Sequence, residues 1–431
     1  MKIVLWSIIF LIGLNLQQSV LGADDLIGKL DQIGKIGMEH NPQLSGLYRA
    51  MESDSVRTPA SGSLPDPIIS FNIMNLPIDH FVFNQEPMSG KQIAFMQKFP
   101  LFGKLGLKEE IAQLSAKIRK FYWQEARNRL AAQVRKIYLD LFYLEQTLKT
   151  ISENQELLRQ FINVSQTRYA TGKGSQQDVL KAQVALSKLI RMEIITQQKK
   201  ESQWQQLLDL VDYEINAEYE VPDSISFKPE KIKKEWIKSV AFTQRPLLKL
   251  YETNLETLKK KALLSKKMLL PDITASIAYT QRDVLKTGVG GTDYLSAGIS
   301  LNIPLYFQSK QKPEIQASQI AVDKGMDDIR NTRNLIRFQV EDLLIKLEKN
   351  VSLIRLYETG ILPQAQQSLS AAFTGYQTDK IDFLTLLNNQ KTLLDLKLEY
   401  IRFLTDYYQS LSNLTYTVGL ESLEQLIKKS Q

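Results

Sequence analysis

The sequence contains an internal repeat with a period of about 205 residues, and this feature limits the possible folds more than any other. Four matching segments occur in the same order in both halves. Three share a proline: Asn41-Pro42 with Arg245-Pro246, Leu64-Pro65-Asp66 with Leu270-Pro271-Asp272, and Phe99-Pro100-Leu101 with Ile303-Pro304-Leu305. The fourth matches Arg168-Tyr169 with Gly375-Tyr376. Each half, 24–221 and 222–431, is expected to form a helix, two strands, a very long helix, a tight turn and a long return helix.

The amino end predicts export from the cytoplasm. Lys2 precedes an apolar run from Ile3 to Leu16, and small residues follow at Ser19, Gly22 and Ala23. This arrangement is typical of a secretory signal peptide, expected over residues 1–23. No later stretch reaches the roughly 18 consecutive apolar residues that a spanning helix needs. Any membrane crossing by the mature chain is therefore expected to use β-strands.

Composition argues against several classes of function. The chain has no cysteine, which excludes disulfides and thiolate metal sites. Its net charge of +7 is spread over helical stretches that mix acidic and basic residues, which predicts solvated helix faces and no nucleic-acid binding. His40 and His80 are the only histidines, and no serine lies in a G-x-S-x-G setting. We therefore expect no catalytic residues and no cofactor, and we predict that the chain is not an enzyme.

Alternating residues predict four strands, at about 68–76, 91–99, 273–280 and 294–303. In the last two, apolar residues alternate with small, mostly polar ones. In an outer membrane, this pattern places an apolar face toward lipid and a polar face toward an aqueous lumen. The residues predicted to face the lumen are Ser70, Asn72, Thr274, Ser276, Ser296, Ser300 and Asn302. Four strands cannot close a barrel, and open edges in lipid leave backbone groups unpaired, so oligomerisation is expected.

Long helices are predicted at about 104–171, 176–218, 313–376 and 381–418. Apolar residues spaced by threes and fours indicate coiled-coil seams in two of them. The seam residues are Leu130, Val134, Ile137, Leu141, Leu144, Leu148 and Ile151, and in the second half Val340, Leu344, Leu347, Val351 and Ile354. A helix of about 65 residues would be roughly 100 Å long at ~1.5 Å per residue. The expected fold class is α+β, mainly α, with a long coiled-coil helical barrel and a transmembrane β-barrel.

The predicted turn between the first two long helices carries a family motif. Residues 168–183 resemble the RYxxGxxxxxDVLxAQ segment of the TolC family of outer-membrane efflux proteins, and the likeness covers nearly all of the mature sequence. The region from Leu64 to Leu105 looks like the heavy-metal efflux branch of that family. The resemblance implies a homotrimer in the outer membrane, with a twelve-stranded barrel and a helical tunnel in the periplasm. Its implied partners are a periplasmic adaptor (membrane fusion) protein, an inner-membrane transporter and the lipid bilayer.

The resemblance also implies roles for individual residues. The expected adaptor contacts at the helix-turn tips are Gly172, Lys173, Asp379 and Lys380. The expected residues of the periplasmic aperture are Asp178, Lys181, Thr385 and Asn388. Some relatives have an acidic ring where this chain has the neutral Thr385 and Asn388, which argues against an aspartate-based cation gate. Asp178 is equally explained as an acidic residue at a helix start, where the helix dipole favours negative charge.

The predicted function is passive conduction of small solutes, with metal cations and drugs as candidate cargoes. Two alternatives remain open: a channel of the same fold that exports proteins, and a periplasmic coiled-coil scaffold or adaptor without a pore. His80, Met74, Met88 and Met96 are soft or borderline ligands around the first loop between strands. Their spacing matches no ligand motif, and methionines commonly fill apolar gaps, so no metal site is assigned.

Overall fold

The structure, a computed structural model, describes residues 20–212, 221–222 and 224–430. The predicted signal peptide, residues 1–23, lies outside the described residues except for its last four positions. The chain forms two compact units. The helical unit comprises the chain up to Pro42, Arg127–Gln244 and the chain from Arg337, and the sheet unit comprises Gln43–Ala126 and Arg245–Ile336. Each unit therefore contains segments from both halves of the sequence.

Two helices precede the first strand in each half, whereas one was predicted. They are α1 (Ala23–His40) and α2 (Pro42–Gly62) in the first half, and α5 (Lys234–Gln244) and α6 (Pro246–Lys267) in the second. The break falls at Pro42 and Pro246, the first matching prolines of the repeat. Proline has no N–H to donate within a helix but is favoured in a first helical turn, so each proline separates two helices.

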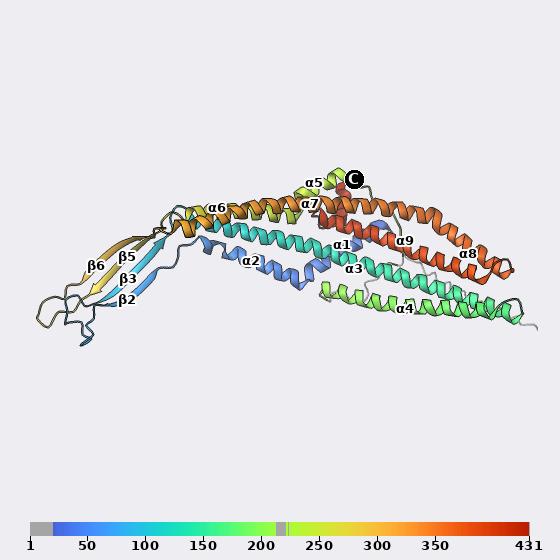
Figure 1. Cartoon of the computed structure of the whole chain (residues 1–431), viewed down its shortest axis with the longest axis horizontal. Coiled ribbons are helices and arrows are strands. Elements are labelled where there is room, and N and C mark those ends of the chain that lie inside the picture. Colours follow the sequence, from blue (N-terminus) through green and yellow to red (C-terminus); the bar gives the residue numbers. More distant parts are fainter. Residues whose placement is uncertain (1–19, 213–220, 223, 431) are drawn as a thin grey trace, which may run out of the picture. The chain divides into compact units, whose positions relative to one another are not determined.

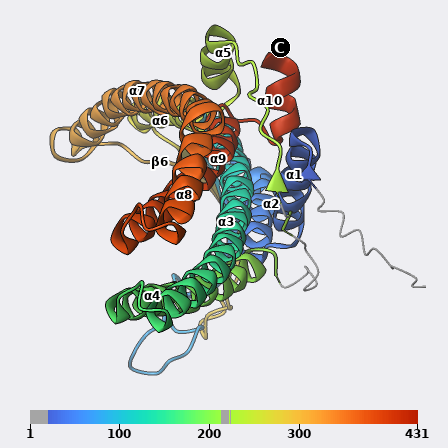
Figure 2. The ribbon, with the colours of Figure 1, turned by 90° about the vertical axis from the view of Figure 1, so that its right-hand side faces the viewer.

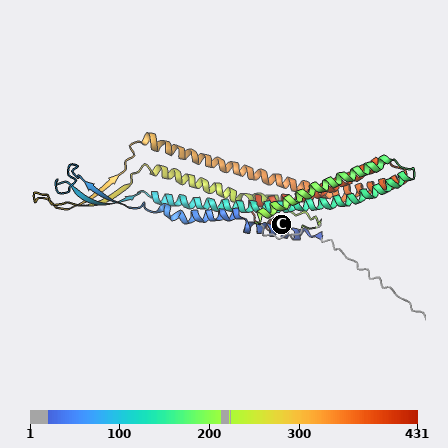
Figure 3. The same ribbon diagram turned by 90° about the horizontal axis from the view of Figure 1, so that it is seen from below.

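The long helices form antiparallel hairpins. α3 (Lys104–Ala170) is one uninterrupted helix of 67 residues, and α4 (Gln176–Leu210) returns along it. In the second half, α7 (Lys312–Leu356) leads through a π-helical turn into α8 (Leu362–Gln377), and α9 (Phe383–Thr417) returns. Within the helical unit, the α3–α4 and α8–α9 hairpins lie side by side, as the end-on view shows (Figure 2). Their turns lie at the same end of this unit (Figure 3).

The second long helix is less regular than the single helix predicted over 313–376. The interval from the repeat proline to the repeat tyrosine is 69 residues in the first half and 72 in the second. π-helical turns at Phe307–Gln311 and Tyr357–Ile361 take up additional residues, because a π turn accommodates one residue more than an α-helical turn. The return helix of the first half ends at Leu210, and residues 213–218, the end of the stretch predicted as helix, lie outside the described chain.

The seam residues form much of the core of the helical unit. Val134, Leu141 and Ile151 are buried on α3, and Val340 and Ile354 are buried on α7. Further along the hairpins, a cluster of buried apolar side chains comes from α3, α4, α8 and α9; it includes Leu158, Phe161, Leu189, Leu369, Leu386 and Leu394. A short helix, α10 (Leu423–Ser430), follows α9. None of the helices that the structure describes has a segment apolar and long enough to cross a membrane.

The sheet unit contains one antiparallel sheet of four strands in the order β2-β3-β5-β6 (Figure 1). The strands are β2 (Ile68–Met74), β3 (Gly90–Phe99), β5 (Ile273–Gln281) and β6 (Tyr294–Leu301). Pairing between β3 and β5 joins the hairpin of the first half to that of the second. β2 and β6 are the edge strands, and each is paired on one side only within the described chain.

Candidate functional site

The first candidate region is the pair of turns that join the long helices. In the turn after α3, Gly172 has a φ of +71°. This left-handed conformation favours glycine because a Cβ would crowd the following carbonyl. The N–H of Lys173 donates to the Arg168 carbonyl at 2.8 Å, which closes the end of α3. Ser175 then caps the start of α4 by accepting from the N–H of Gln177.

The turn between α8 and α9 has the same backbone design with different residues. Asp379 holds the left-handed position with a φ of +65°, which aspartate tolerates better than most residues. The N–H of Lys380 donates to the Gly375 carbonyl at 2.8 Å. Asp382 caps α9 by accepting from the N–H of Thr385 at 2.9 Å, and this hydrogen bond lowers the pKa of Asp382. The two turns are therefore equivalent structures from the two halves of the repeat.

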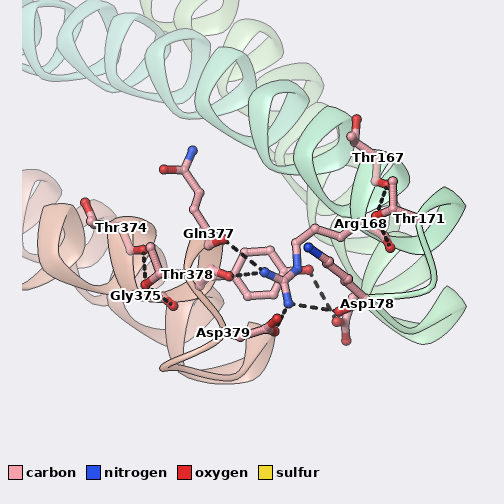
Figure 4. A network of polar contacts seen from close by, with 11 residues as sticks. Thr167, Arg168, Thr171, Asp178, Thr374, Gly375, Gln377, Thr378 and Asp379 are labelled. Carbon is pink, nitrogen blue, oxygen red and sulfur yellow. Dashed lines mark hydrogen bonds and ion pairs between the residues drawn. The ribbon is translucent and has the colours of Figure 1, made fainter.

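Arg168 joins the two turns (Figure 4). Its guanidinium donates to the carbonyl oxygens of Tyr376 and Gln377 at 2.6 and 3.2 Å, and to that of Lys173 at 2.9 Å. It also forms an ion pair with Asp379, and its central carbon lies 4.7 Å from the centre of the Tyr376 ring. Only 12% of the Arg168 side chain is exposed. One side chain of the first hairpin thus binds carbonyls at the end of α8 that have no partner within that helix.

A second contact between the hairpins involves Tyr376 and Asp178. The Tyr376 hydroxyl donates to a carboxylate oxygen of Asp178 at 3.3 Å. Tyr376 is buried, with 3% of its surface exposed. Burial and the nearby Asp178 carboxylate raise the pKa of Tyr376 to about 12. The tyrosine therefore stays protonated at neutral pH and remains a hydrogen-bond donor to the other hairpin.

The repeat explains why an ion pair forms between the turns. Arg168 matches Gly375 in the second half, and Gly172 matches Asp379. Each half supplies one charged residue and has glycine at the position of the other charge. In the sequence, Arg168 and Tyr376 stand out only as parts of a motif, and their contact is not predicted from it. The one sequence feature that could have predicted the ion pair is that each half has a glycine where the other half has the charged residue.

The two turns also differ in where each has its large side chain and where it has glycine. A Cβ on Gly375 would lie 2.8 Å from the Ile381 side chain, which is closer than such atoms approach in proteins. Gly174 matches Ile381 in the first half, and a Cβ there would lie 2.9 Å from the Cβ of Arg168. Each turn therefore combines one large side chain with one glycine.

The structure places every predicted tip and aperture residue in the helical unit. The four predicted tip residues, Gly172, Lys173, Asp379 and Lys380, are exposed in the two turns. Of the predicted aperture residues, Asp178 contacts Tyr376, and Thr385 belongs to the cap of α9. Lys181 and Asn388 line a common groove, with a volume of about 790 Å³, to which α4 and α9 both contribute.

The second candidate region is the polar face of the sheet. The register places Ser70, Ala94, Ala278 and Ser296 in one row across the four strands. Asn72 on β2 donates to Gln92 on β3 at 3.2 Å, and Gln92 donates to Thr280 on β5 at 3.1 Å. The predicted lumen residues that alternate onto this face are Ser70, Asn72, Thr274, Ser276, Ser296 and Ser300. The seventh, Asn302, follows β6 and accepts a hydrogen bond from the N–H of Asp272.

The opposite face of the sheet is apolar and open to solvent in a single chain. One row across it contains Phe71, Ile93, Tyr279 and Leu295. Phe71 is 77% exposed and Leu295 is 72% exposed. A continuous apolar face of this kind is unusual in a soluble monomer and indicates contact with lipid or protein.

The residues considered as metal ligands do not form a recognisable site. His80 lies beside Asp79, with 3.9 Å between Nε2 and the nearer carboxylate oxygen. Met88 lies 3.9 Å from the guanidinium of Arg282, and Met96 is paired with Ser276 across the sheet. Among residues 20–212, 221–222 and 224–430, no group of three or more His, Asp or Glu side chains is placed to hold a metal ion.

Comparison with known proteins gives a consistent result. Residues 238–420 match the family model described as outer membrane efflux protein. The chain is 19% identical over 325 residues to the cobalt-zinc-cadmium resistance protein CzcC of Cupriavidus metallidurans, and the match covers 74% of each protein. The outer membrane protein VceC of Vibrio cholerae has a similar structure, with a TM-score of 0.77, 15% identity and coverage of 91% of this chain and 96% of VceC.

A second solved structure, that of CusC, has a TM-score of 0.74 at 12% identity, over 91% of this chain and 92% of CusC. The similarity extends over both units of the chain and over both halves of the repeat. It agrees with the mainly α fold with four strands that was predicted from the sequence. Residues 238–420 thus resemble the outer membrane efflux protein family, and the chain as a whole has the same fold as VceC and CusC.

Proposed function

We propose that the protein is the outer-membrane channel of a tripartite efflux system and acts as a passive conduit for small solutes. The four-stranded sheet carries this proposal, because it has one apolar face, one polar face and two edges that no strand of the described chain pairs with. Unpaired edges are costly in lipid, where no water can satisfy the backbone. Three copies joined edge to edge through β6 and β2 would close a twelve-stranded barrel with no free edge.

In the closed barrel, the two faces of the sheet would have different environments. Phe71, Ile93 and Leu295 would face lipid, and Ser70, Asn72 and Thr280 would line an aqueous lumen. Asn72, Gln92 and Thr280 on this face are neutral and hydrogen-bonded to one another, so they would let hydrated solutes pass without holding them. The register adds one lysine to the same face, Lys98, in the row of Thr274 and Ser300. We propose no catalytic role for any residue, and the energy for transport would come from an inner-membrane transporter.

The helix turns are proposed as the contact with a periplasmic adaptor and as the gate. Lys173 and Lys380 project from adjacent exposed turns that are joined by Arg168. Docking of an adaptor on these turns would have to compete with the Arg168–Asp379 ion pair to separate the hairpins. Replacing both Lys173 and Lys380 with glutamate should weaken adaptor crosslinking. Unchanged crosslinking would remove these turns from the proposed interface.

Divalent metal cations are the cargo that we propose to test first. The relative CzcC is named for cobalt, zinc and cadmium resistance, and its match covers 74% of this chain. A polar lumen without a cluster of metal ligands does not by itself select a metal, so selectivity would reside in the transporter. Deleting the gene should raise sensitivity to these metals. Increased sensitivity to drugs alone would assign the chain to drug efflux.

Reconstitution tests the channel itself. The protein should require detergent for extraction, run as a trimer in native mass spectrometry and conduct ions in a planar lipid bilayer. The rival function, a periplasmic scaffold without a pore, predicts a water-soluble monomer or dimer and no conductance. Isolation of such a species in the absence of detergent would end the channel proposal.

A further inference from the structure

Exposed apolar residues form a band at one end of the sheet. β2 and β5 begin at this end and β3 and β6 finish there, because the four strands are antiparallel. Exposed apolar residues precede β2 and β5 and follow β3 and β6. They are Leu64 before β2, Phe102 after β3, Leu270 before β5, and Leu305 and Tyr306 after β6. Leu305 and Tyr306 are 80% and 75% exposed. Leu64, Phe102 and Leu270 are between 39% and 49% exposed, so every member of the band presents apolar surface to solvent.

Several lysines lie close to the residues of this band in the chain. Lys98 is the second-last residue of β3, which Phe102 follows. Lys266 and Lys267 end α6 just before Leu270, and Lys310 and Lys312 follow Tyr306. Lys266 and Lys310 are exposed, and no side-chain hydrogen bond or ion pair of theirs is seen in the residues that the structure describes. Lys267 and Lys312 are instead held locally, by the carbonyl of Phe102 at 2.6 Å and by Gln308 at 3.2 Å.

The acidic residues of the same region do not neutralise these lysines. Asp272 is already bound by Lys104 at 2.6 Å and by Lys98 at 3.1 Å, and Lys104 is buried. Further carboxylates of this region are Asp66, before β2, Glu314, at the start of α7, and Glu109, whose side chain lies beside Gly62. The band therefore has an excess of positive charge beside exposed aromatic and aliphatic side chains.

We propose that this band binds anionic phospholipids at the membrane surface, an inference that rests on the proposed channel function. The ring of Tyr306 suits the boundary between acyl chains and headgroups, where its apolar body and its polar hydroxyl are both accommodated, and Phe102 adds a purely apolar ring. The ammonium groups of Lys266 and Lys310 are free to pair with lipid phosphates. A lysine close to an anionic surface strengthens binding about fivefold.

Native mass spectrometry of the detergent-solubilised trimer tests the inference. The probes are phosphatidylglycerol, phosphatidylcholine and glycerol 3-phosphate, added at equal concentrations. We expect phosphatidylglycerol adducts to persist and the other two to be lost. A Lys266→Gln/Lys310→Gln variant should bind phosphatidylglycerol roughly 25-fold more weakly. Equal retention of phosphatidylcholine, or capture of glycerol 3-phosphate alone, would overturn the proposal.

A matched variant controls for loss of charge elsewhere. Lys120→Gln/Lys259→Gln removes two exposed lysines from helices of the same unit, away from the strand ends, and should leave lipid binding unchanged. If Lys266→Gln/Lys310→Gln instead dissociates the trimer, the band is a contact between copies and the lipid assignment is wrong. Conductance of the same samples separates the two proposals. A conducting trimer that retains no anionic lipid would refute only this inference.

Discussion

The Arg168–Asp379 ion pair should hold the two helix turns together, and Asp379→Asn tests this directly. Asparagine tolerates the left-handed backbone of residue 379, so the substitution removes the charge without straining the turn. Asp379 is 63% exposed, which keeps the pair near the value of a surface ion pair, at about 1 kcal/mol per chain. If three chains open together, the closed state loses about 3 kcal/mol, which is roughly a 150-fold shift in the equilibrium.

Single-channel recording in planar bilayers measures this shift. The open probability of Asp379→Asn should rise well above that of the wild type at low salt. In 1 M salt the difference should shrink, because ions screen the exposed pair of the wild type. Asp209→Asn is the matched control, since Asp209 is an exposed acidic residue at the end of α4. If Asp379→Asn and Asp209→Asn both gate like the wild type, the ion pair does not hold the turns together.

Three further predictions address packing, the sheet faces and pH. Gly174→Ala should lower stability by about 1–3 kcal/mol in thermal unfolding, because its Cβ would lie 2.9 Å from that of Arg168; an unchanged midpoint would contradict the size exchange between the turns. Leu295→Lys should cost about 2–4 kcal/mol in unfolding from liposomes and Ser296→Lys much less, and equal costs would refute the assignment of faces. Because folding raises the pKa of Tyr376 to about 12, its contribution to stability is complete below pH 10 and is lost as pH rises toward 12. Tyr376→Phe should remove about 2 kcal/mol of that alkaline decline in urea titrations, and an identical decline in both proteins would show that the tyrosine does not titrate in this way.

The strands and the helix seams could be predicted from the pattern of apolar and polar residues alone. Alternation along 273–280 and 294–303 identified two strands because side chains of a strand point to opposite faces in turn. Spacing by threes and fours identified the seams that contain Val134 and Val340, since that period places residues on one face of a helix. The repeat and the motif at 168–183 indicated a resemblance to the TolC family, and the match of residues 238–420 to the outer membrane efflux protein model agrees with it.

Local irregularities were harder to predict. The split of the first helix at Pro42 and Pro246 was missed, although both prolines were noted as repeat anchors. The π-helical turn at Tyr357–Ile361 was also missed. An extra residue in a helix changes the repeat length by one but leaves the apolar period nearly intact, so it is hardly visible in a single sequence.

What the sequence determined by itself is the set of periodic elements and the tandem order in which they occur, because periodicity is a property of neighbouring residues. Only the tertiary structure decided that β3 pairs with β5 across the two halves and that Arg168 reaches Asp379, 211 residues away. Such contacts depend on how long helices and hairpins pack, and the direction of a single side chain follows from that packing. The role of the glycines at matching positions of the two turns follows only from the contacts that the folded turns make.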